Sequence, residues 1–469
     1  MEPLTDTFCA EPLIERSGHP GRSAMSLFDY RDYRYLFAAQ VVSLFGTGLT
    51  TVALGLLAYQ LAGADAGAVL GTALTIKMVA YVTIAPVAAA YADRVPRRLM
   101  LVGLDLIRAA VAVLLPFIDH TWQIYLLVAV LQSASAAFTP TFQAVIPDVV
   151  TDEDDYTQAL SASQLASTME SLLSPVLAAL ALTVMSFHWL FVATTIGFLV
   201  SAALVIRTRI PDAVPSERGH VWERTLAGVR IFAATPRLRG VLALDLVVAA
   251  CGSIVMVNTV NYVRDALDRP QADVAWLLAA SGAGTMMIAL ALPPVLRRIP
   301  ERTVMLCGAG LLLIAALGAV TLSNANGPQR WTAAVVIWIL IGAGMSLVLT
   351  PIGRVLRRSA RPADRPAVFA AQFSLSHLCW LLTYPIAGWG ATLAGFTTTW
   401  TILAVIATAG AITAVLVWPR HDPEELTHTH DPESTDHRHL GHDATEADDG
   451  RIKHTHTFTI DQYHVRWPT

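Results

Sequence analysis

Tyr91-Ala92-Asp93-Arg94-Val95-Pro96-Arg97-Arg98 is the stretch that decides the fold, because it joins two long apolar segments. A related stretch, Val295-Leu296-Arg297-Arg298-Ile299-Pro300-Glu301-Arg302, follows half a chain later, again between apolar segments. In both copies an apolar segment runs into arginines, a proline and a further arginine. A basic loop that returns in a second hydrophobic half indicates a duplicated bundle of membrane helices.

The composition agrees with a membrane protein. Apolar residues make up 54% of the 469 residues and charged residues 14%, which excludes an ordinary water-soluble fold of this length. The four cysteines have no Cys-x-x-Cys spacing, so neither a disulfide framework nor a thiolate metal site is indicated. The chain has no Gly-x-x-x-x-Gly-Lys phosphate loop and no hydrolytic constellation, so we expect neither an ATP-driven pump nor an enzyme.

A membrane-spanning helix needs about 20 mostly apolar residues, and the chain offers twelve such segments in two groups of six. The first group is 35–61, 69–91, 99–118, 122–146, 160–186 and 188–206, and the second is 239–263, 272–296, 303–322, 331–353, 367–391 and 398–418. The sequence therefore predicts an all-α membrane protein made of two six-helix bundles, 35–206 and 239–418. A polar segment 1–34 precedes them, a linker 207–238 joins them, and a tail 419–469 follows.

The positions of the arginines predict the orientation. If the N-terminus is cytoplasmic, nearly all arginines between spans fall on the cytoplasmic side, and the outer loops hold only Arg264, Arg269 and Arg330. An excess of basic residues marks the cytoplasmic side of a membrane protein. We therefore expect a multi-pass protein of the bacterial cytoplasmic (inner) membrane with both termini in the cytoplasm.

Four of the predicted spans carry polar residues at helical spacing. Span 35–61 carries Gln40, Ser43, Thr47 and Thr51, and span 122–146 carries Gln132, Ser135, Thr139 and Gln143, each set on one helical face. Spans 239–263 and 331–353 add Asn258, Asn261, Ser346, Thr350 and Arg354. Such stripes either line a water-accessible path or hold helices together through hydrogen bonds. The recurrence in four spans favours the path.

Ionisable residues inside spans are costly and require a reason. Asp105 and Arg108 lie three residues apart, and we expect them to pair with each other or with Asp93, in a gating or structural role that includes Arg94, Arg97 and Arg98. Asp245 lies about 9 Å into its span at 1.5 Å per residue.

Glu170 and His377 lie deep in their spans, at matching depths of the two halves. They could ligate a divalent metal or carry coupling protons. The alternative is structural: His377 forms a hydrogen bond with a nearby hydroxyl such as that of Tyr384, and the charge of Glu170 pairs with that of Lys77. The sequence leaves both alternatives open.

The tail is acidic and rich in histidine. Residues 421–469 hold nine of the fourteen histidines, three times as His-x-His. We expect metal ligands among His428, His430, His437, His439, His442, His454 and His456. Imidazole without thiolate favours nickel, cobalt, zinc or copper(II). Low hydrophobicity predicts disorder up to Gly450, and the alternating pattern after Thr457 predicts a short strand that docks. An inert solvated tail is the alternative.

The chain resembles the major facilitator superfamily over residues 35–418, because the first basic loop is similar to the Gly-x-x-x-Asp-Arg-x-x-Arg-Arg loop of that family, with Ala89 in place of the glycine. The resemblance implies that the first, fourth, seventh and tenth helices line a central cavity. A narrower resemblance is to the nickel-resistance exporters of the drug and siderophore exporter group. It rests on the tail, on the run Ser376-His377-Leu378-Cys379-Trp380-Leu381-Leu382-Thr383-Tyr384-Pro385 and on Val257-Asn258-Thr259-Val260. That narrower likeness implies proton-driven export of Ni²⁺, with Co²⁺ as a further substrate and no bound cofactor.

Two other functions stay open. One is export of an organic compound, a drug or siderophore, with an incidental metal-binding tail. The other is a membrane sensor whose tail binds metal as a signal, without transport of the metal. The polar stripes favour transport. The partners that we expect are membrane lipid, a divalent metal ion and protons, with no nucleic acid and a monomeric assembly.

Overall fold

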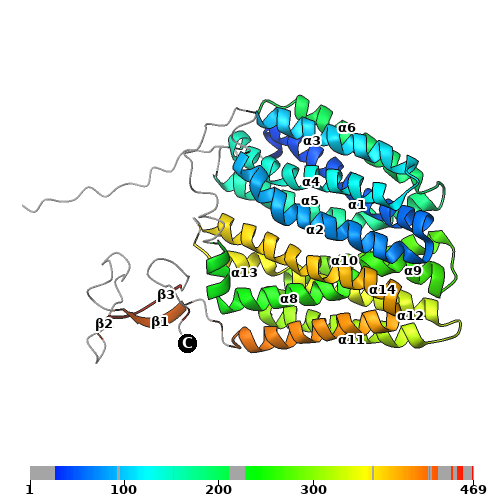
Figure 1. Ribbon diagram of the computed structural model, residues 1–469. Helices are drawn as coiled ribbons and strands as arrows, with labels where there is room; N and C mark the ends of the chain where they lie inside the picture. The colour runs from blue at the N-terminus through cyan, green and yellow to red at the C-terminus, as the bar shows by residue number, and fades with distance from the viewer. Residues whose placement is uncertain are drawn as a thin grey trace, which may run out of the picture.

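The computed structural model describes residues 27–91, 96–150, 153–210, 228–361, 364–420, 422, 425–430, 445–446, 452–457 and 467. Its helices form two halves that lie side by side, with the N-terminal helices in one half and the C-terminal helices in the other (Figure 1). The first residue of α1 and the last residue of α14 lie at the same end of the bundle, next to the strands of the tail. We call this the tail end, and the opposite end the far end.

The N-terminal half is built from six long helices. They are α1 (Arg31–Ala62), α2 (Ala66–Tyr91), α3 (Arg97–Leu114), α4 (Thr121–Val149), α5 (Glu153–Leu182) and α6 (His188–Ile206), with short 3₁₀ turns η1 (Leu27–Asp29), η2 (Gly63–Asp65) and η3 (Leu115–Phe117). Helices satisfy their own backbone hydrogen bonds, which a bilayer cannot do for them. Long apolar runs in a membrane therefore become helices.

The C-terminal half contains α8 (Pro236–Ser253), α9 (Thr259–Asn261), α10 (Gln271–Val295), α11 (Glu301–Asn324), α12 (Arg330–Leu349), α13 (Ile352–Ser359) and α14 (Arg365–Val417). Two π-helical turns, η4 (Ile254–Asn258) and η5 (Tyr262–Ala266), continue α8 through α9 into one longer segment. Gly395 interrupts α14 with φ 78° and ψ 169°, a conformation that favours glycine. The break falls between the predicted spans 367–391 and 398–418.

Nine segments in the described part of the chain are long and apolar enough to cross a membrane. One of them, Arg31–Ile84, contains both α1 and most of α2, and another, Ala367–Val417, contains the break at Gly395. Helix α5, which carries more polar residues, is outside the nine. The all-helical membrane bundle is thus confirmed, whereas the count of twelve spans and the predicted domain boundaries stay predictions.

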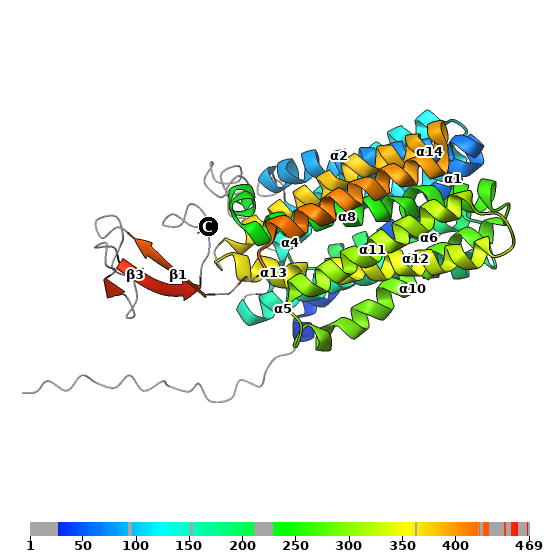
Figure 2. The ribbon, with the colours of Figure 1, turned by 90° about the horizontal axis from the view of Figure 1, so that it is seen from below.

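Glycines let the two halves approach each other along α2 and α14. A Cβ atom on Gly71 would lie 2.8 Å from the Cα of Gly388 and 2.9 Å from the carbonyl oxygen of Tyr384. Small residues at such crossings allow close backbone packing, which stabilises helix association in a membrane. The α2–α14 contact therefore forms one seam between the halves, and α5 packs on α10 along a second (Figure 2).

The tail forms a small antiparallel sheet in the order β1–β3–β2, from β1 (Glu425–His430), β3 (Ile452–Thr457) and β2 (Thr445–Glu446). The predicted disorder up to Gly450 is wrong for β1 and β2, because threonines alternate with the other residues of β1 and β3 and favour extended backbone. The predicted docking strand beyond Thr457 falls mostly outside the described residues. Its Trp467 does contact the bundle, at Arg237.

Candidate functional site

A cluster of ionisable and aromatic side chains lies between the halves. Glu170 of α5 and Lys77 of α2 are partly buried and interact electrostatically with each other. The side chain of Glu170 reaches α1 because Gly48 has no Cβ, which would collide with Glu170 Oε1. The structural alternative places these two side chains together, and the structure shows them as electrostatic neighbours, with no direct hydrogen bond or close ion pair between them among the contacts of the described residues.

His377 of α14 brings the C-terminal half into the cluster. Its ring is stacked on that of Tyr81 of α2, with 5.2 Å between the centroids and an interplanar angle of 4°. Its Nδ1 bonds the carbonyl oxygen of Phe373 over 2.6 Å, so in a neutral ring Nδ1 carries the proton and Nε2 keeps its lone pair. The Phe373 ring completes the stack at 5.8 Å from that of Tyr81.

Lys77 connects the two residues that the sequence placed at matching depths. Its Nζ lies 5.8 Å from the centroid of the Tyr81 ring, and it interacts electrostatically with both Glu170 and His377. A cation at this position repels a dication and attracts the carboxylate. Within the described residues, no group of three His, Cys, Asp or Glu side chains could hold a metal ion.

The polar stripes divide into residues that are hydrogen-bonded within the fold and residues that are not. Thr47 donates to the carbonyl oxygen of Ser43, four residues earlier, over 3.0 Å. Gln40 and Gln132 are buried, and in the described structure nothing donates to either side-chain oxygen. Thr139 is partly buried. The two glutamines therefore have hydrogen-bonding capacity to offer, as does Asn261, whose buried Oδ1 has no donor in the described structure.

Asn258 holds the C-terminal half together. Its Nδ2 donates to the carbonyl oxygen of Ala387 over 2.8 Å, and its Oδ1 accepts from Trp400 Nε1 over 3.0 Å. Both functional atoms of the amide are thereby occupied. The structure therefore engages this predicted path residue in packing between α14 and the π-helical turn η4.

Asn261 belongs instead to a closure of the far end. Its Nδ2 donates to the carbonyl oxygens of Gly63 and Ala64, at 3.3 and 3.0 Å, in the other half. Beside it Tyr59 donates to Asp265 Oδ1 over 2.5 Å. A further hydrogen bond between the halves joins Trp389 Nε1 to Thr72 Oγ1, at 3.1 Å. The far end is closed by these contacts.

The predicted gating residues are only partly described. Asp93 and Arg94 lie outside the described residues, Arg97 begins α3, and Arg98 donates to the carbonyl oxygen of Ile206. Asp105 and Arg108 pair with each other, the first of the two predicted arrangements.

The pair between Asp105 and Arg108 is fully embedded in the N-terminal half. Ser201 of α6 donates to the second oxygen of Asp105 over 2.7 Å. The rings of Phe138 and Phe198 lie 4.1 and 4.5 Å from the guanidinium carbon of Arg108. These contacts favour a structural role, because both charges are compensated inside one half.

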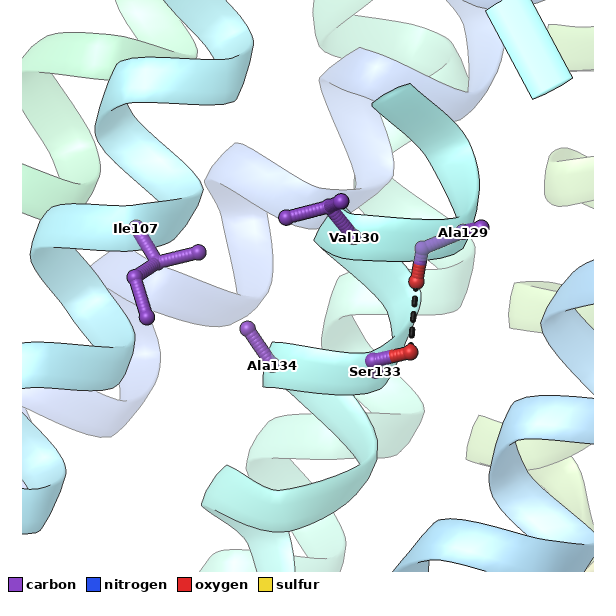
Figure 3. Close-up of a pocket in the computed structure, with 5 residues that line it drawn as sticks. All are labelled: Ile107, Ala129, Val130, Ser133 and Ala134. Atoms are coloured by element: carbon purple, nitrogen blue, oxygen red, sulfur yellow. Dashed lines mark hydrogen bonds between the residues drawn. The ribbon is translucent and has the colours of Figure 1, made fainter. Parts of the chain in front are cut away.

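A groove of about 340 Å³ opens between α3 and α4 (Figure 3). Its lining is apolar except for Ser133, whose hydroxyl donates to Ala129 of its own helix over 2.6 Å. Ile107 and Val130 at its rim are exposed, on a bundle surface that would meet lipid. It is separate from the cluster of Lys77, Glu170 and His377.

In the tail, four of the predicted metal ligands fall on paired strands. His428 is the register partner of His454, and His430 and His456 follow two positions further along their strands. His437, His439 and His442 lie outside the described residues.

Sequence reasoning missed Tyr81, Gln372, Tyr59 and Asp265 as site residues. Tyr81 follows Lys77 by four positions, and Gln372 precedes His377 by five, so the first is a helical neighbour of a residue that the sequence had singled out. Gln372 donates to Asp245 Oδ2 over 2.7 Å. Polar residues one turn away from an intramembrane charge are the signal that could have found Tyr81.

Known proteins similar to this chain are membrane transporters. An uncharacterized MFS-type transporter of Bacillus subtilis, YfiS, is 25% identical over 360 residues, covering 74% of this chain and 84% of that protein. Macrolide efflux protein A of Streptococcus pyogenes is 25% identical over 181 residues, covering 38% of this chain and 44% of that protein.

Among solved structures, the nucleoside transporter NupG superimposes with a TM-score of 0.65 at 14% identity, over 82% of this chain and 100% of that one. A bacterial homologue of the human lysosomal transporter Spinster, in an inward-facing and unoccupied conformation, gives 0.64 at 15% identity, over 83% and 97%. At these identities the likeness shows the fold. The family model of the Major Facilitator Superfamily matches residues 36–325 and 242–456, and the chain belongs to that superfamily as a multi-pass membrane transporter.

Proposed function

We propose that this chain exports apolar organic compounds that carry a basic amine. The observation that carries the proposal is the stack of Tyr81, His377 and Phe373 beside the Lys77–Glu170 pair. Aromatic faces suit flat apolar surfaces and attract cations, while a single carboxylate can bind one ammonium group. In this proposal Glu170 exchanges Lys77 for the amine of the substrate.

The relatives support an organic substrate and the direction of transport. The names of similar proteins include macrolide efflux proteins from Streptococcus pyogenes and Enterococcus faecalis. The proposal for this chain has further parts. Transport is export and is driven by the proton gradient, and the protein lies in the bacterial cytoplasmic membrane with both termini in the cytoplasm.

A second candidate is export of Ni²⁺, with Co²⁺ as a further substrate. The register of β1 and β3, with His428 opposite His454, favours it, because imidazoles on adjacent strands can share a metal. The amine of Lys77 beside Glu170 and His377 opposes it, because it stands where a dication would have to cross. We therefore rank organic export first.

Growth and vesicle transport assays separate the two candidates. The chain is expressed in a sensitive bacterium and challenged with macrolides, other organic amines, and nickel and cobalt salts. Organic export predicts higher tolerance to the amines and uptake of amine into everted vesicles, with no change in metal tolerance. Tolerance to metal alone would reverse our ranking.

Two variants connect the outcome to the site. Glu170→Gln should abolish amine transport while the protein stays in the membrane. The matched control is Glu301→Gln, which removes the same charge from the Arg354 pair at the tail end, where the nitrogen and oxygen are 2.9 Å apart. Equal losses in both variants would mean that Glu170 does not recognise the amine.

A further inference from the structure

One carboxyl group in the C-terminal half has no positive partner among the described residues. Asp245 of α8 is 2% exposed, and its Oδ2 accepts a hydrogen bond of 2.7 Å from Nε2 of Gln372, which is 9% exposed. Within the described structure nothing donates to Asp245 Oδ1 or to Gln372 Oε1. Both atoms are acceptors, and they belong to two side chains that already touch.

The other intramembrane acids differ from Asp245 in this respect. Asp105 is paired with Arg108 and accepts from Ser201, and Glu170 has Lys77 as its charged neighbour. A buried carboxylate without a cation is strongly disfavoured, and such a group becomes neutral instead by taking up a proton. The surroundings of Asp245 are therefore those of a protonated acid.

A single proton would supply the missing donor. A neutral carboxylic acid and a primary amide can exchange two hydrogen bonds, with the amide N–H donating to one carboxyl oxygen and the acid O–H donating to the amide oxygen. Gln372 already makes the first of these bonds to Asp245. We propose that Asp245 and Gln372 form a proton-binding site of this transporter, occupied in the conformation whose far end is closed.

The groups around Asp245 do not offer another explanation. On α14 the titratable neighbour is the Cys379 thiol, which interacts electrostatically with the carboxyl. On α11 and α13, which also pack on α8, Arg302 donates to the carbonyl oxygen of Trp418, Arg354 pairs with Glu301 and Arg358 pairs with Asp422. No counter-ion for Asp245 is found among them.

The position of the site suits coupling between the proton and the movement of the halves. Phe373 follows Gln372 directly and packs, together with His377, on Tyr81 across the α2–α14 seam. Loss of the proton would leave a buried carboxylate that keeps only the hydrogen bond from Gln372 Nε2, and it would leave Gln372 Oε1 again without a donor. The turn of α14 that contacts α2 would then have to shift.

Infrared spectroscopy of the purified protein tests protonation directly. In D₂O the parent should show a C=O stretching band of a protonated carboxyl near neutral pH, which Asp245→Asn removes and Gln372→Leu shifts. Asp273→Asn, which alters an acid in the partly exposed pair with Arg269, should leave the band unchanged. A spectrum that is identical in the parent and Asp245→Asn over the accessible pH range would overturn the proposal.

Transport supplies the second readout and rests on the proposed proton-driven export. Asn can exchange two amide hydrogen bonds with Gln372, so Asp245→Asn should fold and still exchange labelled substrate across proteoliposomes, but no longer accumulate it in response to an imposed proton gradient. Gradient-driven accumulation at the parent rate would refute a role in coupling. If the parent moves none of the tested compounds, the infrared result still stands, so the two failures are distinguishable.

Discussion

The indole ring of Trp467 lies over the guanidinium group of Arg237, with 4.8 Å between the guanidinium carbon and the ring centroid. Arg237 is 1% exposed and also contacts Asp422, at 3.4 Å between Nη1 and Oδ1. Asp422 in turn accepts from Arg358 over 2.6 Å and from Trp418 Nε1 over 3.1 Å. Both ends of the tail thus meet at the first turn of α8, next to the ends of α13 and α14.

Asp422→Asn should destabilise the tail end of the C-terminal half. The substitution removes the carboxylate that contacts the buried Arg237, and breaking a buried ion pair costs about 3–5 kcal/mol. We expect a lower midpoint of thermal unfolding for the detergent-solubilised protein. Asp273→Asn, in the more exposed pair with Arg269, is the control and should change the midpoint little. Equal midpoints for both variants would mean that the cluster at Asp422 adds nothing to stability.

Tyr59→Phe should loosen the closure of the far end. The hydroxyl donates to Asp265, and a hydrogen bond to a charged group contributes about 1.5–3 kcal/mol. A loss of 1.4 kcal/mol changes the ratio of two conformations about tenfold. A cysteine introduced at Val260, which is 5% exposed, should therefore react faster with a thiol reagent. Tyr125→Phe, on α4, should leave the rate unchanged, and a rate as slow as the parent's in Tyr59→Phe would argue against this closure.

Lys77 and Glu170 should behave as a coupled pair. Glu170→Gln leaves the partly buried Lys77 without the acid that it interacts with, and Lys77→Met leaves the partly buried Glu170 without its basic neighbour, so each single variant should give less folded protein. The double variant removes both charges and should recover most of the folded protein without recovering transport. Yields that fall additively would show that the two charges are independent, while transport by the double variant would exclude both from the path.

His377→Ala should abolish transport with a smaller loss of folded protein. The imidazole contacts the rings of Tyr81 and Phe373, and its hydrogen bond goes to a carbonyl of its own helix, so packing loses two aromatic contacts of about 0.5–1.5 kcal/mol each. Transport per folded molecule in proteoliposomes is the measurement. His377→Phe, which keeps a ring for the stack, separates the imidazole from the packing, and full activity of that variant would remove His377 from the mechanism.

The sequence predicts what depends on local spacing. Two basic loops between apolar runs identify two halves of a helix bundle, and the interval of three residues predicts that Asp105 pairs with Arg108. Helical periodicity also places Gln40 and Gln132 each on the polar face of its own helix, and both side chains are buried.

Contacts between the halves are beyond such reasoning. Tyr81 stacks on His377, and Tyr59 donates to Asp265 across 206 positions of sequence. These pairs depend on how two bundles of similar shape meet, and no spacing in one helix contains that information. Periodicity likewise cannot tell a polar residue that faces a path from one that, like Asn258, holds its own half together.

The histidines of β1 and β3 offer the last prediction, which concerns the tail whatever the bundle transports. In antiparallel strands, alternate positions share a face, so the register puts His428, His430, His454 and His456 on one face. Thr427 and Thr455 are also register partners and occupy alternate positions, on the other face. The full-length protein in which His428→Ala and His454→Ala are combined should bind Ni²⁺ roughly tenfold or more weakly, at least about 1.4 kcal/mol. The combined Thr427→Ala and Thr455→Ala variant should bind as the parent does, as measured by equilibrium titration. If the threonine pair weakens binding as much as the histidine pair, the strand register does not define the metal site.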